Sequence, residues 1–379
     1  MPARAVTADP SPSQAAVAES IRARIDEVDR QIVNLLNRRA RHALEMARYK
    51  DRAGRPVYAP DREVRVLSRL RQSNLGPLPA ESLEHVFREI ISGCRSLQAP
   101  LQVAYLGPEY TFSHQAAVAL FGRSAKLSPR DAIADLFEAL QRGKAQVGLV
   151  PVENSSQGAV AEVLDRLMDS HLMICGETYL AVSHVLMSCT EDIGRVRRVH
   201  SHPQALAQCR RWLGRNLGHA AQRAEASTAR AARLAAEDPQ AAAVGSRILA
   251  EALGLNLLAE DIQDSGLNTT RFLVLGSEDC PACGRDKTSI CFITAHQPGS
   301  LHQVLGCLAQ RRLNLTRIES RPVQDRPWEY IFFVDFEGHR MSPAVADALD
   351  EVGRQVEFLR VLGSYPQANA SCNAGSRGG

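Results

Sequence analysis

Thr270 and Arg271 are adjacent residues that stand directly before a short apolar run, Phe272 to Leu275. An arginine can bind a carboxylate through two parallel hydrogen bonds, and a threonine hydroxyl beside it can donate a proton. The apolar run has the length and composition of a buried strand. We therefore expect a hydroxyl and a guanidinium at the mouth of that strand, where they would suit a small substrate with two negative charges.

Three more turns rich in Ser, Thr and Asn lie upstream in the same segment. The start of a helix offers free backbone N–H groups and the positive end of a dipole, and hydroxyl side chains add further donors. Ordinary helix capping explains any one such turn, but four in one segment favour a cleft that holds carboxylates. The side chains concerned are Ser113, Glu153, Asn154, Ser155 and Thr228.

Composition limits the class of protein. Apolar residues make up 45% of the 379 and charged residues 23%, as in soluble globular proteins. The net charge of +3 gives no general footprint of nucleic-acid binding, and no apolar run is long enough to span a membrane. Nine cysteines without a pairing pattern favour a reducing cytoplasm.

Two short motifs have the spacing of metal ligands. Cys280 and Cys283 are one such pair, but no second pair accompanies them, so we expect free thiols. His200 and His202 also lack a third ligand nearby, and we interpret them as turn residues with local hydrogen bonds. We therefore expect no metal site.

Residues 19–99 have the periodicity of an all-helical domain. Apolar residues recur at helical spacing from 19 to 51, and two shorter helical stretches follow at 61–72 and 80–97. The first helix would be about 50 Å long, too long to bury one face within a small domain. We expect it to pack against a second copy of the chain, in a homodimer or a higher homo-oligomer. Residues 1–18 are expected to form a disordered tail.

Residues 101–276 alternate short apolar runs with amphipathic helices, which is typical of an α/β domain with largely parallel strands. A linker at 277–287 leads to a strand–helix–strand–strand–helix–strand pattern at 288–366, the ferredoxin-like α+β arrangement. Residues 367–379 are low in apolar content and are expected to be disordered. The strands predicted in the α/β domain are 103–106, 147–150, 182–187, 241–244 and 272–275.

Charges on the helical domain could share one site. Arg39 and Lys50 are eleven residues apart and lie on one face of the first helix. Arg22 is seventeen residues before Arg39, about 25 Å along the helix axis. One small ligand can contact both only if Arg22 comes from an antiparallel second copy. The alternative is that these charges are the solvated faces of a helical bundle, and composition alone favours it.

The helical domain nevertheless resembles the all-helical class of chorismate mutases. The resemblance implies a site across a dimer, in which Arg39, Arg62 and the partner subunit's Arg22 hold the two carboxylates of chorismate. The matching positions are Arg22, Ile25, Asp26, Asp29, Ile32, Leu35, Leu36 and Arg39, then Lys50, Pro56-Val57 and Asp61-Arg62-Glu63.

The same resemblance implies that Lys50 and Gln98 hydrogen-bond the ether oxygen whose bond breaks. Glu63 would accept a hydrogen bond from the ring hydroxyl. This chemistry needs no nucleophile or general base, because a Claisen rearrangement is promoted by conformational restraint and positive charge at the ether oxygen.

Residues 101–276 resemble prephenate dehydratase. The resemblance implies two α/β lobes like those of periplasmic binding proteins, with the site between them. Thr270 would donate a proton to the departing hydroxyl, and Arg271 would bind a carboxylate of prephenate. The matching motifs are Gly107 to His114, Pro151 to Gly158, His200 to Cys209, Ser227-Thr228 and Asn268 to Phe272.

The dehydratase resemblance also implies that Ser113, Asn154, Ser155 and Thr228 bind the substrate, and that Glu153 is an orienting carboxylate. Loss of CO2 and hydroxide together creates an aromatic ring. A cleft that protonates the hydroxyl and strips water from the carboxylate is sufficient for that step, so we expect no metal or organic cofactor.

Residues 288–366 resemble the amino-acid-binding ACT domain that accompanies prephenate dehydratases. The elements concerned are a helix start and a strand end, which without the resemblance are equally suited to packing. Phenylalanine binding would inhibit the enzyme by favouring an inactive arrangement. The residues implied to bind phenylalanine are Gly299, Leu301, Glu319, Ser320 and Arg321.

Together the resemblances imply a bifunctional enzyme of phenylalanine biosynthesis that converts chorismate to prephenate and prephenate to phenylpyruvate. Three alternatives remain at this point. The helices could serve only to dimerise a dehydratase, the dehydratase could prefer arogenate, or the protein could be a non-catalytic amino-acid sensor.

Overall fold

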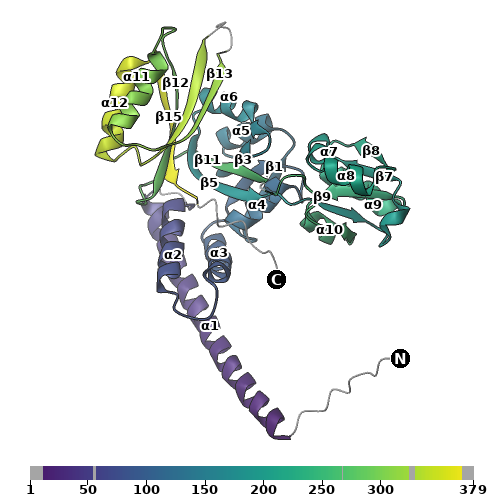
Figure 1. The fold of residues 1–379 in the computed structure, drawn as a ribbon. Helices are drawn as coiled ribbons and strands as arrows, with labels where there is room; N and C mark the ends of the chain where they lie inside the picture. The colour runs from purple at the N-terminus through teal and green to yellow at the C-terminus, as the bar shows by residue number, and fades with distance from the viewer. Residues whose placement is uncertain (1–11, 54–56, 267, 324–328, 369–379) are drawn as a thin grey trace.

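The computed structural model describes residues 12–53, 57–266, 268–323 and 329–368. A helical module, a two-lobed α/β domain and a ferredoxin-like domain follow one another along the chain (Figure 1). The predicted tail at 1–18 is already helical from Pro12, and three of the residues from 12 to 18 are Ala, the best helix former. The rest of that tail, and residues 369–379 of the C-terminal one, lie outside the described residues.

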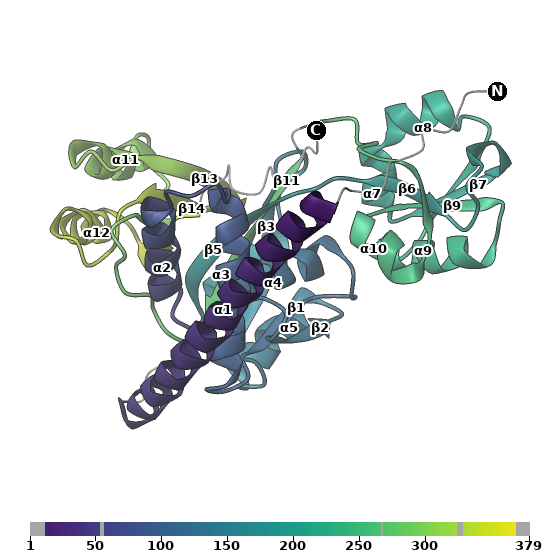
Figure 2. The same ribbon diagram turned by 90° about the horizontal axis from the view of Figure 1, so that it is seen from below.

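The helical module consists of one long helix and two shorter ones. Pro60 stands in the first turn of the second helix, where its missing N–H costs nothing. In the turn to the third helix, the Asn74 amide donates to the Leu78 carbonyl at 2.8 Å. The long helix projects from the body, with the third helix beside it (Figures 1 and 2). The three helices are α1 Pro12–Ala53, α2 Pro60–Ser73 and α3 Ala80–Ser96.

The first lobe of the α/β domain is built on a sheet with the order β2-β1-β3-β11-β5, and β4 pairs with β3. The chain leaves this lobe after β5 and returns in β11, which lies antiparallel between β3 and β5. The elements of this lobe are β1 Gln102–Leu106, α4 Phe112–Phe121, β2 Lys126–Arg130, α5 Ile133–Gln141, β3 Val147–Asn154, β4 Gly158–Ala159, α6 Ala161–Asp169, β5 Met173–Ala181 and β11 Thr269–Gly276.

The second lobe has a sheet with the order β10-β6-β9-β7-β8, and its core is rich in alanine and leucine. Its elements are β6 Val185–Ser188, the 3-10 turn Ile193–Arg195, β7 Arg198–Ser201, α7 Pro203–Gln208, α8 Arg210–Asn216, β8 Ala221–Ala224, α9 Thr228–Glu237, β9 Ala241–Gly245, α10 Arg247–Leu253 and β10 Asn256–Ala259.

The prediction of largely parallel strands is wrong in detail, because both sheets are mixed. In the first lobe β1 is parallel to β2 and β3, but β11 is antiparallel to both of its neighbours. The reason is the double crossing between lobes, which brings the chain back in the reverse direction. The predicted strand at 182–187 begins only at Val185, since residues 182–184 are one of the crossings.

The ferredoxin-like domain has the predicted element order and a sheet with the order β13-β14-β12-β15. Its two helices cover one face of the sheet, and the other face is turned toward the first lobe (Figures 1 and 2). No helix in the described ranges is both long enough and apolar enough to cross a membrane. The elements are β12 Asp286–Ile293, α11 Ser300–Gln310, β13 Leu315–Pro322, β14 Tyr330–Glu337, α12 Pro343–Gln355 and β15 Phe358–Pro366.

Candidate active and effector sites

Thr270 and Asn154 face each other at the ends of two neighbouring strands. The register of β11 against β3 places them directly opposite one another. The side-chain amide of Asn154 donates to Thr270 Oγ1 at 2.9 Å and to Asn268 Oδ1 at 2.8 Å. Because Thr270 Oγ1 accepts this bond, its own proton remains available for another acceptor. Thr270 is half-buried and therefore not sealed into the core.

Ser155 lies beside these residues because it binds the backbone of Thr269. Its N–H donates to the Thr269 carbonyl at 2.9 Å, and its Oγ accepts from the Thr269 N–H at 3.0 Å. These two bonds extend the β3–β11 pairing by one residue beyond the strand end. The structure therefore brings three of the predicted residues together: Asn154, Ser155 and Thr270.

Ser113 and Thr228 approach the lobe boundary from opposite sides. Ser113 is buried in the first turn of α4, and Thr228 opens α9 in the second lobe. The loop before Ser113 contacts the second lobe, where the Ser246 hydroxyl donates to the Tyr110 carbonyl at 3.0 Å. Thr228 lies close to Gly245, the residue before that serine. A Cβ added at Gly245 would be in van der Waals contact with the Thr228 Cβ, at 3.6 Å.

A second contact crosses the boundary, because the Gln204 amide donates to Gln157 Oε1. His202 caps α7 through its ring, and His200 pairs with Glu225 at 2.9 Å. His202 therefore makes the local hydrogen bond expected of a turn residue. The expectation is wrong for His200, because it lies within strand β7 and its partner Glu225 is 25 residues further along the chain.

Arg271 does not stand beside Thr270, contrary to the expectation of a carboxylate ligand. Its guanidinium donates to Glu177 Oε2 at 2.8 Å, to Asp335 Oδ2 at 2.6 Å and to the Tyr365 hydroxyl at 3.0 Å. The side chain is buried. The physical reason is the pleat, since successive residues of a strand point to opposite faces of the sheet.

Glu153 lies on the same face of the sheet as Arg271, opposite it in the strand register. Its carboxylate accepts from Arg317 Nε of β13 at 3.0 Å. The face of β3 and β11 that carries Glu153 and Arg271 is therefore covered by the ferredoxin-like domain, while Asn154 and Thr270 occupy the other face.

The buried charges extend further into that domain. Lys287 Nζ donates to Glu177 Oε1 at 2.8 Å, and the Ser289 hydroxyl donates to Asp335 Oδ1 at 2.6 Å. Burial raises the pKa of Asp335, but the guanidinium groups of Arg271 and Arg317 outweigh it and hold the pKa below its ordinary value. We refer to Glu153, Glu177, Arg271, Lys287, Arg317 and Asp335 as the interdomain charge network.

Sequence reasoning missed Glu177 and Asp335, although a signal was present. Glu177 is the one carboxylate of strand β5, and Asp335 stands between the apolar residues Val334 and Phe336 of β14. A carboxylate in such a position must be paired, because burying an isolated charge is costly.

In the helical module, Lys50 and Glu63 lie near one another. Lys50 Nζ donates to the Val57 carbonyl at 3.1 Å, and Glu63 forms an ion pair with the buried Arg95. Burial lowers the pKa of Lys50, and burial raises the pKa of Glu63 despite the Arg95 guanidinium. Arg95, which was not predicted, also donates to the Phe121 carbonyl of the first lobe at 2.6 Å.

The other predicted mutase residues are spread over the helical module, with Arg22 and Arg39 on α1, Arg62 on α2 and Gln98 just after α3. Arg22 is 74% exposed and lies 3.6 Å from Glu19 on the projecting part of α1. Arg39 is half-buried and Arg62 is exposed. Gln98 has a buried Oε1 for which the described residues offer no hydrogen-bond donor.

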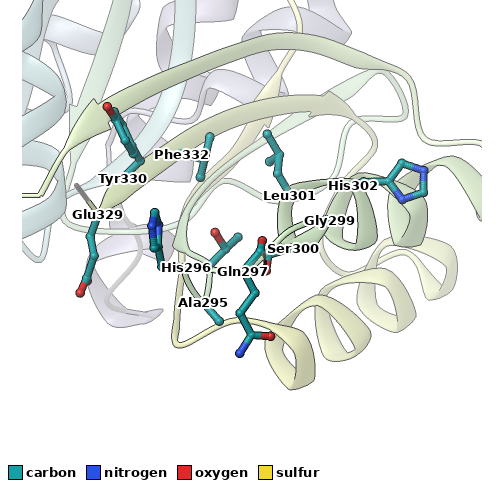
Figure 3. A pocket seen from close by; sticks show the side chains of 11 residues that line it. Ala295, His296, Gln297, Gly299, Ser300, Leu301, His302, Glu329, Tyr330 and Phe332 are labelled. Atoms are coloured by element: carbon teal, nitrogen blue, oxygen red, sulfur yellow. Dashed lines mark hydrogen bonds between the residues drawn. The ribbon is translucent and has the colours of Figure 1, made fainter.

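A cavity of about 410 Å³ lies at the start of α11 in the ferredoxin-like domain (Figure 3). Its walls come from the loop after β12, the first turn of α11 and strand β14. Gly299 precedes the helix with φ of 86°, a conformation that favours glycine. Leu301 and Phe332 supply the apolar part of the lining, and Glu329 adds a carboxylate.

Glu319, Ser320 and Arg321 do not line this cavity, so the five predicted effector residues fall into two groups. Arg321 Nη2 instead donates to Asp165 Oδ2 of α6 at 3.1 Å, in the first lobe. Glu319 lies 3.9 Å from Arg317. The alternation of β13 directs these charged side chains away from its exposed face.

The fold defines a three-part protein, in which a two-lobed α/β domain with polar side chains at the lobe boundary lies between a helical module and a ferredoxin-like domain. Three family models match in this order: chorismate mutase type II over residues 21–99, prephenate dehydratase over 103–280 and ACT domain over 290–354.

The chain is similar to proteins over nearly its whole length and to a solved structure over part of it. The chain is 43% identical over 354 residues to the bifunctional chorismate mutase/prephenate dehydratase of Aquifex aeolicus, covering 92% of this chain and 98% of that protein. It is 41% identical over 362 residues to the protein of the same description from Stutzerimonas stutzeri, covering 94% and 99%. The solved structure of an Arthrobacter aurescens prephenate dehydratase in complex with L-Phe has a TM-score of 0.66 and 33% identity, covering 72% of this chain and 91% of that one.

The chain belongs to the bifunctional chorismate mutase/prephenate dehydratase family. It is an enzyme of phenylalanine biosynthesis with a mutase and a dehydratase activity. This sets aside both the non-catalytic sensor and the dehydratase with purely structural helices.

Replacing Asp335 with asparagine leaves the buried Arg271 charge without one of its two carboxylates. We expect Asp335→Asn to lower the free energy of unfolding at pH 7 by about 3–5 kcal/mol. The folded-state pKa of Asp335 is depressed, so its stabilisation is present above the unfolded value and is lost as the pH falls through the folded value. The wild-type advantage should therefore be constant above about pH 5 and shrink below about pH 4.

Urea titrations across this pH range measure the effect, with Asp347→Asn on the exposed side of α12 as the matched control. A loss at pH 7 no larger than that of the control would show that the Asp335 carboxylate does not hold the two domains together.

Proposed function

We propose that prephenate binds at the boundary between the two lobes, against Thr270, Asn154 and Ser155. Ser113 and Thr228 add donors from the starts of α4 and α9. The observation that carries this proposal is the 2.9 Å bond from the Asn154 amide to Thr270 Oγ1, because it leaves the threonine proton for the substrate. Glu153 belongs to the supporting side of the sheet and not to the substrate contacts.

In the proposed reaction the bond from the ring to the carboxylate breaks, and its electrons enter the ring as CO2 leaves. The ring hydroxyl departs as water with the proton of Thr270, which the threonine recovers from solvent. Hydrogen-bond donors at the boundary favour the binding of the carboxylates, and exclusion of water from the reacting carboxylate favours its loss.

Removing the Thr270 hydroxyl should abolish the second activity alone. We expect Thr270→Val to lower the dehydratase kcat by at least about 100-fold, since general-acid catalysis contributes roughly 100- to 10,000-fold. Thr270→Ser should retain most of it. Phenylpyruvate formation measures the effect, and chorismate turnover by the same preparation is the control for folding. A fully active Thr270→Val enzyme would refute the role of the hydroxyl.

For the mutase activity we propose a site shared by two copies of the chain in a homodimer. The support is α1, a helix of 42 residues whose apolar side chains Ile25 and Val28 are 54% and 53% exposed. An exposed apolar row of this length needs a second surface. Arg39, Arg62 and the partner subunit's Arg22 hold the carboxylates of chorismate.

Within each such site we propose that Lys50 and Gln98 donate to the ether oxygen and that Glu63 accepts from the ring hydroxyl. The ion pair between Glu63 and Arg95 fixes the carboxylate and joins the mutase module to the first lobe. The rearrangement then proceeds by restraint and by positive charge where the ether oxygen gains negative charge.

A shared site predicts complementation between defective subunits. Arg22→Ala and Arg39→Ala should each lower the mutase kcat/KM by about 100-fold or more, with dehydratase activity retained. When the two variants are mixed and allowed to exchange subunits, half of the dimers are mixed and one of their two sites is intact. Mutase activity should therefore recover to about a quarter of wild type. No recovery, despite subunit exchange detected by mass spectrometry, would argue that each site is formed by one chain.

We further propose that phenylalanine is the effector and inhibits the dehydratase. The support is the cavity of about 410 Å³ at the start of α11, where free N–H groups suit a carboxylate and Leu301 and Phe332 suit an aromatic ring. Gly299 permits the tight turn at the helix start. Ser320 and Glu319 stay predictions for this site.

The route of inhibition follows from the contacts of β13 and β14 with the first lobe. Arg317 pairs with Glu153, Asp335 with Arg271, and these two lobe residues neighbour Asn154 and Thr270 in their strands. Arg321 and Asp165 add a third contact. An effector that shifts the ferredoxin-like sheet therefore acts on β3 and β11, the two strands that carry Asn154 and Thr270.

Uncoupling this route should separate binding from inhibition. We expect Arg317→Met to raise the phenylalanine concentration that half-inhibits the dehydratase by at least about 5-fold, while calorimetric binding without substrate stays within about 2-fold. Arg354→Met is the control, because this arginine is exposed and belongs to α12, which covers the face of the sheet turned away from the first lobe (Figure 1). Unchanged inhibition in Arg317→Met would rule out this contact as the route.

We also propose that the enzyme works in the cytoplasm. The eight cysteines within the described ranges are free thiols, as expected in a reducing compartment.

A further inference from the structure

A continuous row of side-chain hydrogen bonds leads from the second lobe to Thr270. His184 Nε2 contacts Gln208 Oε1 at 2.7 Å, and the Asn268 amide donates to the same oxygen at 2.9 Å. Asn268 Oδ1 accepts from the Asn154 amide at 2.8 Å, and that amide donates to Thr270 Oγ1 at 2.9 Å. His184, Asn268 and Asn154 are buried, and Gln208 is half-buried.

The row passes through both crossings between the lobes. His184 lies on the outgoing crossing before β6, Asn268 ends the returning crossing before β11, and Gln208 is the last residue of α7. Backbone bonds tie these segments together, since the Ile262 N–H donates to the His184 carbonyl at 3.0 Å and the Asp264 N–H to the Gln208 carbonyl at 2.7 Å. The row therefore joins the second lobe to Asn154 and Thr270 in the first lobe.

The donors and acceptors of the row have one consistent direction. Gln208 Oε1 accepts twice, so Asn268 must turn its NH2 toward Gln208 and its oxygen toward Asn154. Asn154 must then turn its NH2 toward Asn268 and Thr270. The Ser156 N–H, which donates to Asn154 Oδ1 at 3.0 Å, requires the same orientation. With Asn154 reversed, its oxygen would take the proton of Thr270.

His184 begins the row as a donor. Because Gln208 offers an oxygen, the ring must carry its proton on Nε2, and the neutral form suffices. Burial lowers the pKa of His184, although the bond to Gln208 opposes this effect. The ring packs edge-on against Phe112 of α4 at 5.3 Å between centroids. This packing fixes the ring from the side of the first lobe.

We propose that Gln208 and Asn268 are positioning residues for the dehydratase reaction, which hold Asn154 in the orientation that keeps the Thr270 proton for the substrate. The inference rests on the role proposed above for Thr270. It adds that the side-chain oxygen of Gln208, in the second lobe, sets the direction of the hydrogen bond between Asn154 and Thr270 in the first lobe.

The test compares three variants. Gln208→Met keeps the length of the side chain but removes the acceptor, so the dehydratase kcat should fall by about 10- to 100-fold with KM for prephenate within about 2-fold. Gln208→Glu keeps an accepting oxygen and should recover kcat to within about 5-fold of wild type. Gln263→Met is the matched control, because Gln263 Oε1 accepts from the backbone N–H of His184 at 2.8 Å and stands outside the row. It should keep kcat within about 2-fold.

Mutase turnover, measured on the same preparations, should be equal in all three variants and in wild type, which separates a positioning defect from unfolding. In a Thr270→Val background, Gln208→Met should cause no further loss of dehydratase activity. Equal losses in both backgrounds, or no rescue by Gln208→Glu, would overturn the inference. A Thr270→Val enzyme as active as wild type would overturn the proposed function instead.

Discussion

Arg271 is a buried positive charge, and the rest of the dehydratase architecture depends on how that charge is neutralised. Its two carboxylate partners come from different domains, Glu177 from the first lobe and Asp335 from the ferredoxin-like domain. Since a buried charge is tolerated only with well-placed counter-charges and hydrogen bonds, the docked ferredoxin-like domain stabilises β11 in its place between β3 and β5. The ferredoxin-like domain is thus part of the structure that supports the strand carrying Thr270.

The two faces of β11 then have separate tasks. One face presents Thr270 to Asn154, and the other presents Arg271 to Asp335. The neighbouring strand β3 repeats this division, with Asn154 on one face and Glu153 on the other. A displacement of the ferredoxin-like sheet reaches both strands at residues directly adjacent to the site, without a long path. The row of hydrogen bonds through Gln208 and Asn268 reaches the Thr270 hydroxyl from the second lobe. Contacts from the second lobe and from the ferredoxin-like domain therefore both influence the position of Thr270.

Much of the fold could be predicted from the sequence, because long amphipathic helices and the ferredoxin-like pattern are strong local signals. The order of the domains and the helices at Ser300–Gln310 and Pro343–Gln355 follow from periodicity alone. The strand direction could not be predicted, since it depends on the chain crossing between lobes and returning in β11. For the site, Thr270 and Asn154 were identified as residues but their pairing was not. Arg271 was misplaced because adjacency in sequence was taken for adjacency in space, whereas a pleated strand separates neighbours to opposite faces.

The pairing of Arg271 with Asp335 is tested most directly by a double-mutant cycle on the free energy of unfolding, with Arg271→Met, Asp335→Leu and the double variant. Each single change strands one buried charge, whereas the double change replaces both by apolar groups of similar size. We expect the double variant to lose clearly less stability than the sum of the two single losses. Losses that simply add would mean that the two residues do not depend on each other, and the interdomain charge network would then not be what holds β11 in place.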